Sequence, residues 1–223
     1  MNDIRITPLP VQRHLEQCER WPRNGRVILA HHDARSVVVY QAYRPAIGEY
    51  AIAHGRLDGP DFSLARMSWI KPNFLWMMYR SGWGTKPGQE VTLGLRLRRA
   101  FFERVVREAV PSIFDPARFA DRDAWQAAVG RSEVRLQWDP DHAPNGAKLE
   151  RRAIQLGLRG RTLAAFAHEE LLEVIDMRAF VDAQRPHAQH NQDPELRTPE
   201  EHPLDLLPDD DRSLQKATDE ETR

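Results

Sequence analysis

The predicted strands and helices of this sequence do not alternate in a regular order, and that order constrains the fold more than any other feature. β-Branched or alternating patterns predict short strands at residues 26–31, 37–42, 90–97, 133–138 and 153–158. Apolar residues at helical spacing predict helices at residues 45–54, 73–80, 99–110, 116–129 and 161–175. Because a doubly wound sheet needs regular β-α-β alternation, we expect an α+β fold instead. The hydrophobic content of 41% suffices for one sizeable core, so residues 1–184 are expected to form a single globular domain.

Charge divides the chain near residue 184. Residues 185–223 contain five basic and eleven acidic side chains, whereas residues 1–184 carry a net charge of +5. The C-terminal part also contains five prolines and no aromatic residue, a composition typical of disordered segments. We therefore expect a disordered acidic tail over residues 185–223, which could fold back over a basic surface and compete with anionic ligands.

Several protein classes are excluded by simple features. No segment approaches the roughly 20 consecutive apolar residues of a membrane span, and residues 1–5 lack the start of a secretory signal. The single cysteine, Cys18, excludes an intramolecular disulfide and a multi-thiolate metal site. His31, His32 and Asp33 have no further ligand at suitable spacing, so we expect no metal. These features predict a cytoplasmic protein without a membrane partner.

Residues 66–90 carry the clearest functional signal. This segment holds three of the six tryptophans and four cationic side chains, Arg66, Lys71, Arg80 and Lys86. Cations beside planar rings suit an anionic ligand with an aromatic face, such as a nucleotide, a dinucleotide or single-stranded nucleic acid. The alternative interpretation is that the rings belong to the core and the cations are solvated or paired.

The predicted helix in this segment places candidate ligand-binding side chains on neighbouring faces. Trp76 and Arg80 are four residues apart and share a helix face, with Tyr79 on an adjacent strip. The helix is expected to end at Gly82, where backbone amides and the Ser81 hydroxyl would be free to meet a ligand. Weaker candidates lie on later strands, at Gln137, Asp139, Arg152 and Gln155.

Four strings resemble the family filed as domain of unknown function number 4291. They span residues 39–43, 66–83, 137–140 and 152–158, and the resemblance runs from about Arg26 to about Val181. The family label implies no reaction. The sequence departs from the family pattern at Leu29, where an arginine would be expected within an Arg-Ala-x-Tyr-Asp string.

More distantly, the chain resembles ADP-ribosyltransferase-like proteins. The strand over residues 37–43, followed by a helix and Gly55-Arg56-Leu57, is similar to the opening unit of small members of that group. Gln41 stands where those members carry a histidine or an arginine. The resemblance implies NAD as a substrate and a late catalytic glutamate, for which Glu90 and then Glu133 are the candidates on strands.

Three hypotheses follow for function. The first is an NAD-using transferase with Glu90 as its catalytic carboxylate. The second is a non-enzymatic module that binds a nucleotide or nucleic acid, and the third is a structural domain whose Trp-rich helix is only core. The candidate cofactor-binding residues are Gln41, Arg66, Lys71, Trp76, Tyr79, Arg80, Ser81, Trp83 and Lys86.

Overall fold

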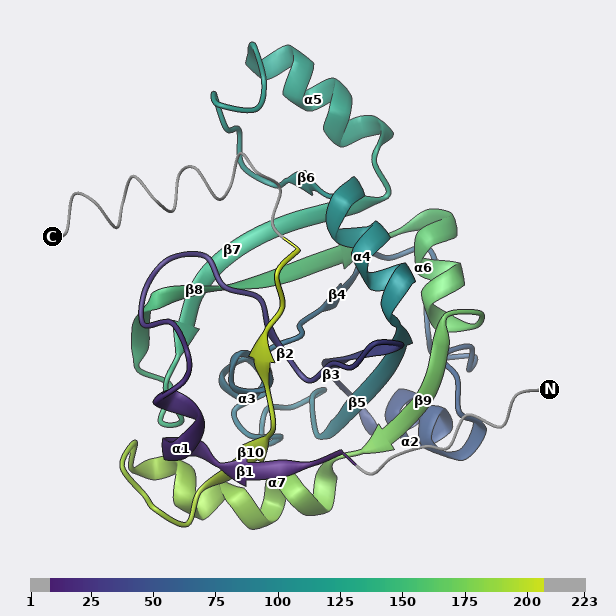
Figure 1. Cartoon of the computed structure of the whole chain (residues 1–223). Helices are drawn as coiled ribbons and strands as arrows, with labels where there is room; N and C mark the ends of the chain where they lie inside the picture. Colours follow the sequence, from purple (N-terminus) through teal and green to yellow (C-terminus); the bar gives the residue numbers. More distant parts are fainter. Residues whose placement is uncertain (1–8, 207–223) are drawn as a thin grey trace, which may run out of the picture.

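Two sheets form the centre of the fold in this computed structural model, which describes residues 9–206 (Figure 1). The strands are β1 (Val11–Arg13), β2 (Leu29–Ala30), β3 (Ser36–Tyr43), β4 (Ser68–Ile70), β5 (Val91–Arg98), β6 (Val110–Pro111), β7 (Val134–His142), β8 (Lys148–Leu158), β9 (Leu171–Asp176), β10 (Arg197–Pro199) and β11 (His202–Pro203). The helices are α1 (His14–Cys18), α2 (Pro45–His54), α3 (Phe74–Ser81), α4 (Arg99–Glu108), α5 (Arg122–Arg131), α6 (Gly160–Ala167), α7 (Arg178–Gln184) and the 3-10 helix η1 (Arg185–Gln189). The predicted α+β class is confirmed.

The two sheets are joined by an antiparallel bridge between Tyr40 and Lys71, in which each backbone amide donates to the other residue's carbonyl. One sheet has the order β3-β5-β9 and the other β4-β8-β7-β6. The Tyr40 amide of β3 donates to the Lys71 carbonyl, just after β4, at 2.7 Å. This contact brings polar side chains of both sheets close together.

The main core lies between the sheets and the helices packed on them. Apolar side chains of β3, β5, β7 and β8 meet Phe101 and Phe102 of α4 and Phe166 of α6. The strand predicted at 90–97 is confirmed as β5, although its alternating pattern is typical of a strand with only one buried face. Its residues from Val91 to Leu97 are all buried, because β5 lies between β3 and β9.

Helix ends follow local signals in two of the predicted helices. α2 begins at Pro45 and ends at Gly55, whose φ of 68° is left-handed. In α3 the Asn73 side chain accepts a hydrogen bond from the Trp76 amide, and Gly82 closes the helix with φ 59°. A glycine is favoured in this backbone region because it has no Cβ.

Two predicted helices are wrong in part. Asp115 accepts a hydrogen bond from the Ala117 amide within a turn, and the next helix, α5, begins later, after the side chain of Asp121 caps it. The helix predicted over 161–175 ends at Ala167, and residues 171–176 form β9. Pairing with β5 supplies the backbone partners of this strand, a contact that local periodicity does not encode.

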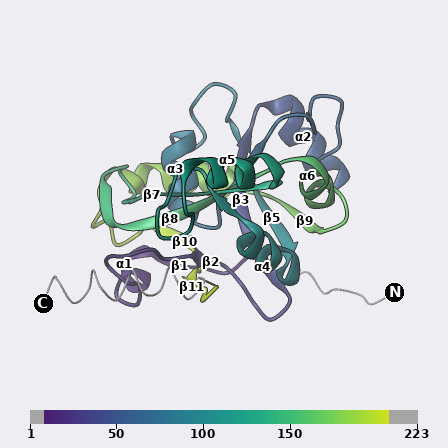
Figure 2. The ribbon, with the colours of Figure 1, turned by 90° about the horizontal axis from the view of Figure 1, so that it is seen from above.

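The C-terminal part of the chain is folded as far as residue 206, which corrects the predicted boundary at 184. β10 pairs with β1 and β11 pairs with β2, on the side of the molecule that carries α1 (Figure 2). Leu196 is fully buried, and the Gln17 amide donates to Thr198 Oγ1 at 2.8 Å. Composition suggested disorder because it carries no information about pairing with residues at the other end of the chain. Residues 207–223 of the predicted tail lie outside the described residues.

Glu201 gives this C-terminal packing a pH dependence. Its buried Oε1 accepts a hydrogen bond from the Phe74 amide at 2.7 Å, and burial raises the pKa of the carboxyl well above its usual range. The folded protein therefore holds this proton more tightly than the unfolded chain, so stability falls as the pH rises above about 4.3.

Glu201→Gln is expected to remove that fall and to raise the free energy of unfolding near neutral pH, because the amide oxygen can still accept from Phe74. Urea unfolding at acidic and neutral pH measures the effect, with the exposed Glu195→Gln as the matched control. An unchanged pH profile in Glu201→Gln would contradict this assignment.

Candidate functional site

A polar cavity of about 620 Å³ lies where the two sheets meet. Its walls come from β3, β4, β7, β8, the helix α3 and the loop before β5. The lining residues are Gln41, Ala42, Tyr43, Arg66, Met67, Ser68, Trp69, Lys71, Met77, Arg80, Gln89, Gln137 and Gln155. Three of these side chains are cationic and none is acidic.

Lys71 is the most unusual group in the cavity. The residue is 5% exposed, and within residues 9–206 its Nζ makes no hydrogen bond or ion pair. Nζ lies over the ring of Trp76, 5.5 Å from its centroid. Burial, followed by the positive charge of Arg80, lowers the pKa of Lys71 to about 8, against the opposing effect of Asp139. A buried ammonium group without an acidic partner is costly.

A hydrogen-bonded frame holds one wall of the cavity. The Gln41 amide of β3 donates to Ser68 Oγ at 2.8 Å and to the Trp69 carbonyl at 3.0 Å, both in β4. The Tyr43 hydroxyl donates to Gln41 Oε1. These bonds join the two sheets and orient Gln41.

The opposite wall is a pair of glutamines on neighbouring strands. Gln137 of β7 and Gln155 of β8 are direct cross-strand partners. Their amides donate to the two carboxylate oxygens of Asp139, at 2.9 Å and 2.6 Å. Asp139 thus fixes both amides without itself lining the cavity.

Arg66 and Arg80 stand at the exposed rim of the cavity. In the described part of the chain neither pairs with a carboxylate: Asp61 pairs with Arg44, and Glu90 accepts from a backbone amide. Gln89 holds Arg80 in place, accepting from Nη1 at 3.1 Å and donating to the carbonyl of Arg80 at 3.2 Å when its amide is turned to satisfy both groups. Both guanidinium groups therefore remain available to a ligand.

Four of the nine predicted cofactor-binding residues, Gln41, Arg66, Lys71 and Arg80, line this cavity. The tryptophans predicted to stack on a ligand are in other places. Trp76 is buried behind Lys71, and Trp83 packs edge-on against Phe74 while its Nε1 donates to the Pro144 carbonyl at 3.0 Å.

Tyr79 is partly exposed, but its ring stacks on His142 at a centroid distance of 3.5 Å. Neither Tyr79 nor the two tryptophans lines the cavity, because α3 is packed against both β3 and β7. These three residues, which were predicted to bind the ligand, therefore lie outside the cavity.

Three further predicted residues serve local structure. Ser81 is buried, and its hydroxyl donates to the Met77 carbonyl at 2.9 Å, so the prediction of a free hydroxyl is wrong. The Lys86 ammonium group donates to the carbonyls of Tyr79 and Arg80 and caps the end of α3. Glu90, the predicted catalytic carboxylate, is exposed, bonds the Gly88 amide at 2.9 Å and does not line the cavity.

A family model described as Domain of unknown function (DUF4291) matches residues 27–208. The chain belongs to this family. The match extends beyond the predicted limit at Val181 and covers the folded C-terminal strands. A comparison with curated proteins gives no match.

Each of the four strings that resemble this DUF4291 family contributes to the cavity or its frame. The strings supply Gln41, Ser68, Lys71, Gln137 and Gln155, among others. Tyr43, Ser68 and Gln89 were not predicted as site residues. Strand alternation was the one available signal for Gln137, since it places this amide opposite the buried Leu136, but no local pattern relates Gln137 to Lys71.

The described residues also lack two other features. No group of three or more His, Cys, Asp or Glu side chains within residues 9–206 is placed to hold a metal ion. No helix in the same range is both long and apolar enough to cross a membrane.

Proposed function

We propose that the cavity binds a phosphate-bearing nucleotide. The observation that carries this proposal is Lys71, a buried ammonium group that faces the cavity without an acidic partner. A phosphate oxygen would supply the missing counter-charge, and Arg66 and Arg80 at the rim would contact further phosphate oxygens. The absence of carboxylates from the lining favours an anion over a cation.

The remaining lining favours a nucleotide over a small inorganic anion. A volume of about 620 Å³ exceeds what a single phosphate group fills. Gln41, Gln137 and Gln155 offer fixed amide groups that suit the hydrogen-bonding edge of a base or the hydroxyls of a ribose. Trp69 adds one aromatic surface to the lining.

An NAD-using transferase is the sharper version of this proposal. In such a reaction the bond between nicotinamide and ribose breaks, nicotinamide leaves with the bonding electrons, and a nucleophilic hydroxyl or amine of an acceptor bonds to the ribose carbon and releases its proton. The chemistry benefits from a carboxylate near the ribose. In this proposal Asp139 replaces Glu90 as that carboxylate. It does not line the cavity and acts as a positioning residue, because its two oxygens accept from the Gln137 and Gln155 amides that do.

The non-enzymatic alternative is a module that binds nucleic acid through the same cations. The exposed rim position of Arg66 and Arg80 favours this possibility, because a longer strand could continue past the cavity. Binding through phosphates would weaken steeply with added salt.

Thermal unfolding of the full chain with ATP, ADP-ribose, NAD or a short single-stranded oligonucleotide tests these proposals. We expect at least one mononucleotide or dinucleotide to raise the melting temperature, and Arg80→Gln to weaken its binding by about tenfold. Arg161→Gln, at an exposed position outside the cavity, is the matched control.

The outcomes separate the candidates. NAD consumption that Asp139→Asn abolishes, with binding retained, would support the transferase. A response to the oligonucleotide alone, lost at high salt, would support the nucleic-acid module. No response to any of the four ligands would overturn the proposed nucleotide site.

A further inference from the structure

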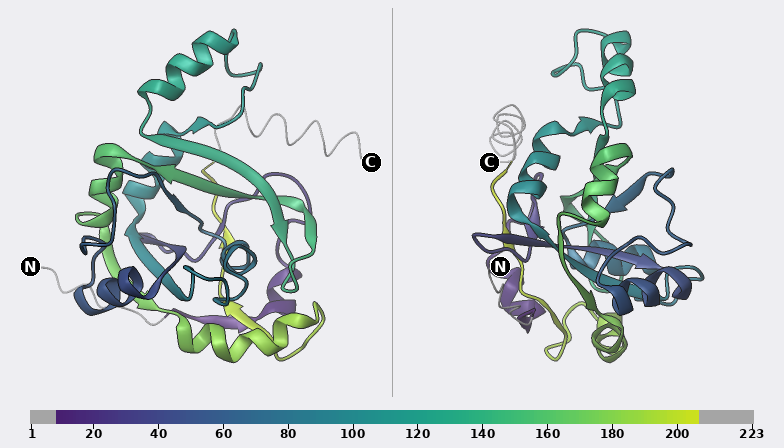
Figure 3. Two further views of the ribbon diagram at one scale, coloured as in Figure 1. Left: turned by 180° about the vertical axis from the view of Figure 1, so that it is seen from behind. Right: turned by 90° about the vertical axis from the view of Figure 1, so that its right-hand side faces the viewer.

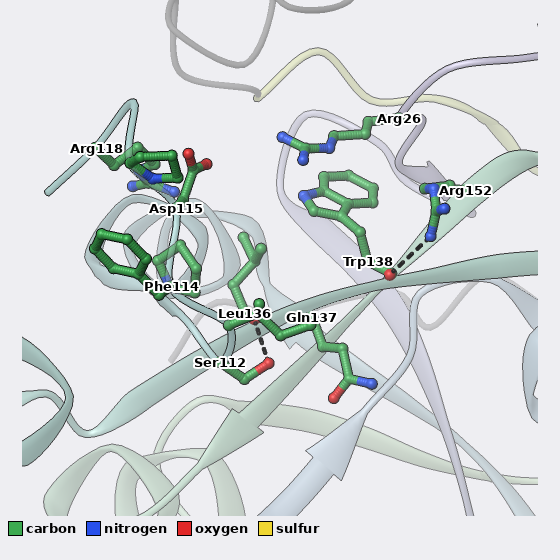
Figure 4. Close-up of a pocket in the computed structure, with 12 residues that line it drawn as sticks. Arg26, Ser112, Phe114, Asp115, Arg118, Leu136, Gln137, Trp138 and Arg152 are labelled. Atoms are coloured by element: carbon green, nitrogen blue, oxygen red, sulfur yellow. Dashed lines mark hydrogen bonds between the residues drawn. The ribbon is translucent and has the colours of Figure 1, made fainter. Parts of the chain in front are cut away.

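A second cleft, of about 460 Å³, lies on the other side of β7 from the Gln137 amide (Figure 4). One wall is the sheet, with Leu136 and Trp138 of β7 and Arg152 of β8. The other wall is the loop of residues 111–118, which leads towards α5. That helix has no buried residue and stands out from the rest of the fold (Figure 3).

The cleft is basic. Arg26, Arg118 and Arg152 line it together with one acidic residue, Asp115. The guanidinium of Arg26 lies 6.0 Å from the centroid of the Trp138 ring, and Arg152 Nη1 donates to the Trp138 carbonyl at 3.4 Å. The indole Nε1 of Trp138 is buried and has no acceptor within residues 9–206. Guanidinium groups therefore dominate the polar lining of the cleft.

The described chain ends beside this cleft. β11 runs antiparallel to β2, with Pro203 opposite Leu29 and the Leu204 amide donating to the Ile28 carbonyl at 2.8 Å. The Leu206 amide then donates to the Leu204 carbonyl at 3.1 Å, so the chain turns out of this register before residue 206. Figure 4 shows the pale yellow C-terminal end of the described chain passing on the Arg26 side of the cleft.

We propose that this cleft is a binding site for a carboxylate-rich peptide segment, and that its resident ligand is the chain's own run Asp209-Asp210-Asp211. These three residues follow residue 206 by three to five positions, a reach of roughly 10 to 18 Å for an extended chain. Arginine binds carboxylates through paired hydrogen bonds, so the guanidinium groups of Arg118 and Arg152 match neighbouring carboxylates of an aspartate run.

The docked segment would act as a competitor at the cleft. Any other anionic ligand, whether an acidic peptide of a partner or a nucleic acid, must displace the aspartates before it reaches the arginines. Because the contact is mainly electrostatic, the competition weakens as ionic strength rises. This cleft shares only Gln137 with the lining of the Lys71 cavity and none of its cations, so the proposal stands or fails independently of the proposed nucleotide.

The test uses the full chain with Asp209, Asp210 and Asp211 all replaced by asparagine. A fluorescent peptide with the native sequence of residues 207–223 is titrated into this variant at low salt, and anisotropy is recorded. We expect the variant to bind the peptide about tenfold more tightly than the native chain, whose cleft is already occupied. Adding Arg118→Gln and Arg152→Gln to the variant should reduce binding by about tenfold or more.

Arg131→Gln in the same background is the matched control, since this exposed arginine lies at the end of α5 outside the cleft. Thermal melts confirm that each variant is folded. Equal binding by the native and variant chains, or binding unaffected by the two cleft substitutions, would overturn the proposal. So would arginine-dependent binding of a labelled oligonucleotide without binding of the peptide, which would make the cleft a nucleic-acid site.

Discussion

Replacing Lys71 with methionine is expected to stabilise the unliganded protein and to abolish nucleotide binding. The buried ammonium group has no acidic partner within residues 9–206, and replacing buried ion pairs with apolar side chains of similar volume can gain about 1–4 kcal/mol, so we expect a gain of this order. The same change removes the central cation of the proposed phosphate site. We expect the affinity for the ligand to fall by about a hundredfold or more.

The pKa of Lys71 predicts how the free energy of unfolding changes with pH. The pKa of Lys71 is about 8 in the folded protein and 10.5 when unperturbed. Between these values the unfolded chain binds more protons, so the free energy of unfolding rises with pH across this window. Lys71→Met should lack this rise.

Ligand binding should show the opposite trend. A bound phosphate favours the charged ammonium group, so affinity should stay level below a pH of about 8 and fall above it. Urea unfolding and ligand titration over this pH range measure both effects, with the exposed Lys148→Met as control. A destabilised Lys71→Met variant that still binds the ligand would refute the assigned role.

Leu196→Ala is expected to destabilise the protein by about 2–5 kcal/mol, the range for a fully buried leucine. Leu196 packs in the second apolar cluster with Phe74, Met78 and Val181, although it lies beyond the boundary that composition predicts for the folded domain. Removing its side chain leaves a cavity between the C-terminal segment and α3.

Chemical denaturation of the full chain measures this loss, and Leu149→Ala is the matched control at a half-exposed position. The control should change the free energy of unfolding by less than about 0.5 kcal/mol. If Leu196→Ala were as mild as Leu149→Ala, the segment after η1 would contribute little to the fold, contrary to its burial in the structure.

Local signals were sufficient for several elements. Pro45 and Gly55 bound α2 as predicted, and Asn73 and Gly82 bound α3, because a cap involves atoms within one helical turn. The strands around residues 37–42 and 133–138 were also recognised from their patterns, although their ends differ. β9 was missed because its edge pairing depends on β5, far away in the sequence.

The residues of the candidate site were likewise only partly predictable from the local sequence. The cations of residues 66–80 were recognised as functional candidates because charges within so apolar a stretch are costly unless they have a partner. Which rings accompany them was predicted incorrectly. Every residue of α3 from Phe74 to Met78 is buried, so the apolar pattern of this helix does not show which side chain faces a cavity.

The sequence by itself determined the α+β class, the ends of α2 and α3, and the cationic character of residues 66–90, since all of these depend on residue type and short spacing. Only the tertiary structure decided that Gln137 and Gln155 share a cavity with Lys71, that Glu90 lies outside it, and that residues 185–206 belong to the fold. The physical reason is the distance along the chain between partners. Gln17 and Thr198, joined by a hydrogen bond, are 181 residues apart, and no local pattern encodes such a contact.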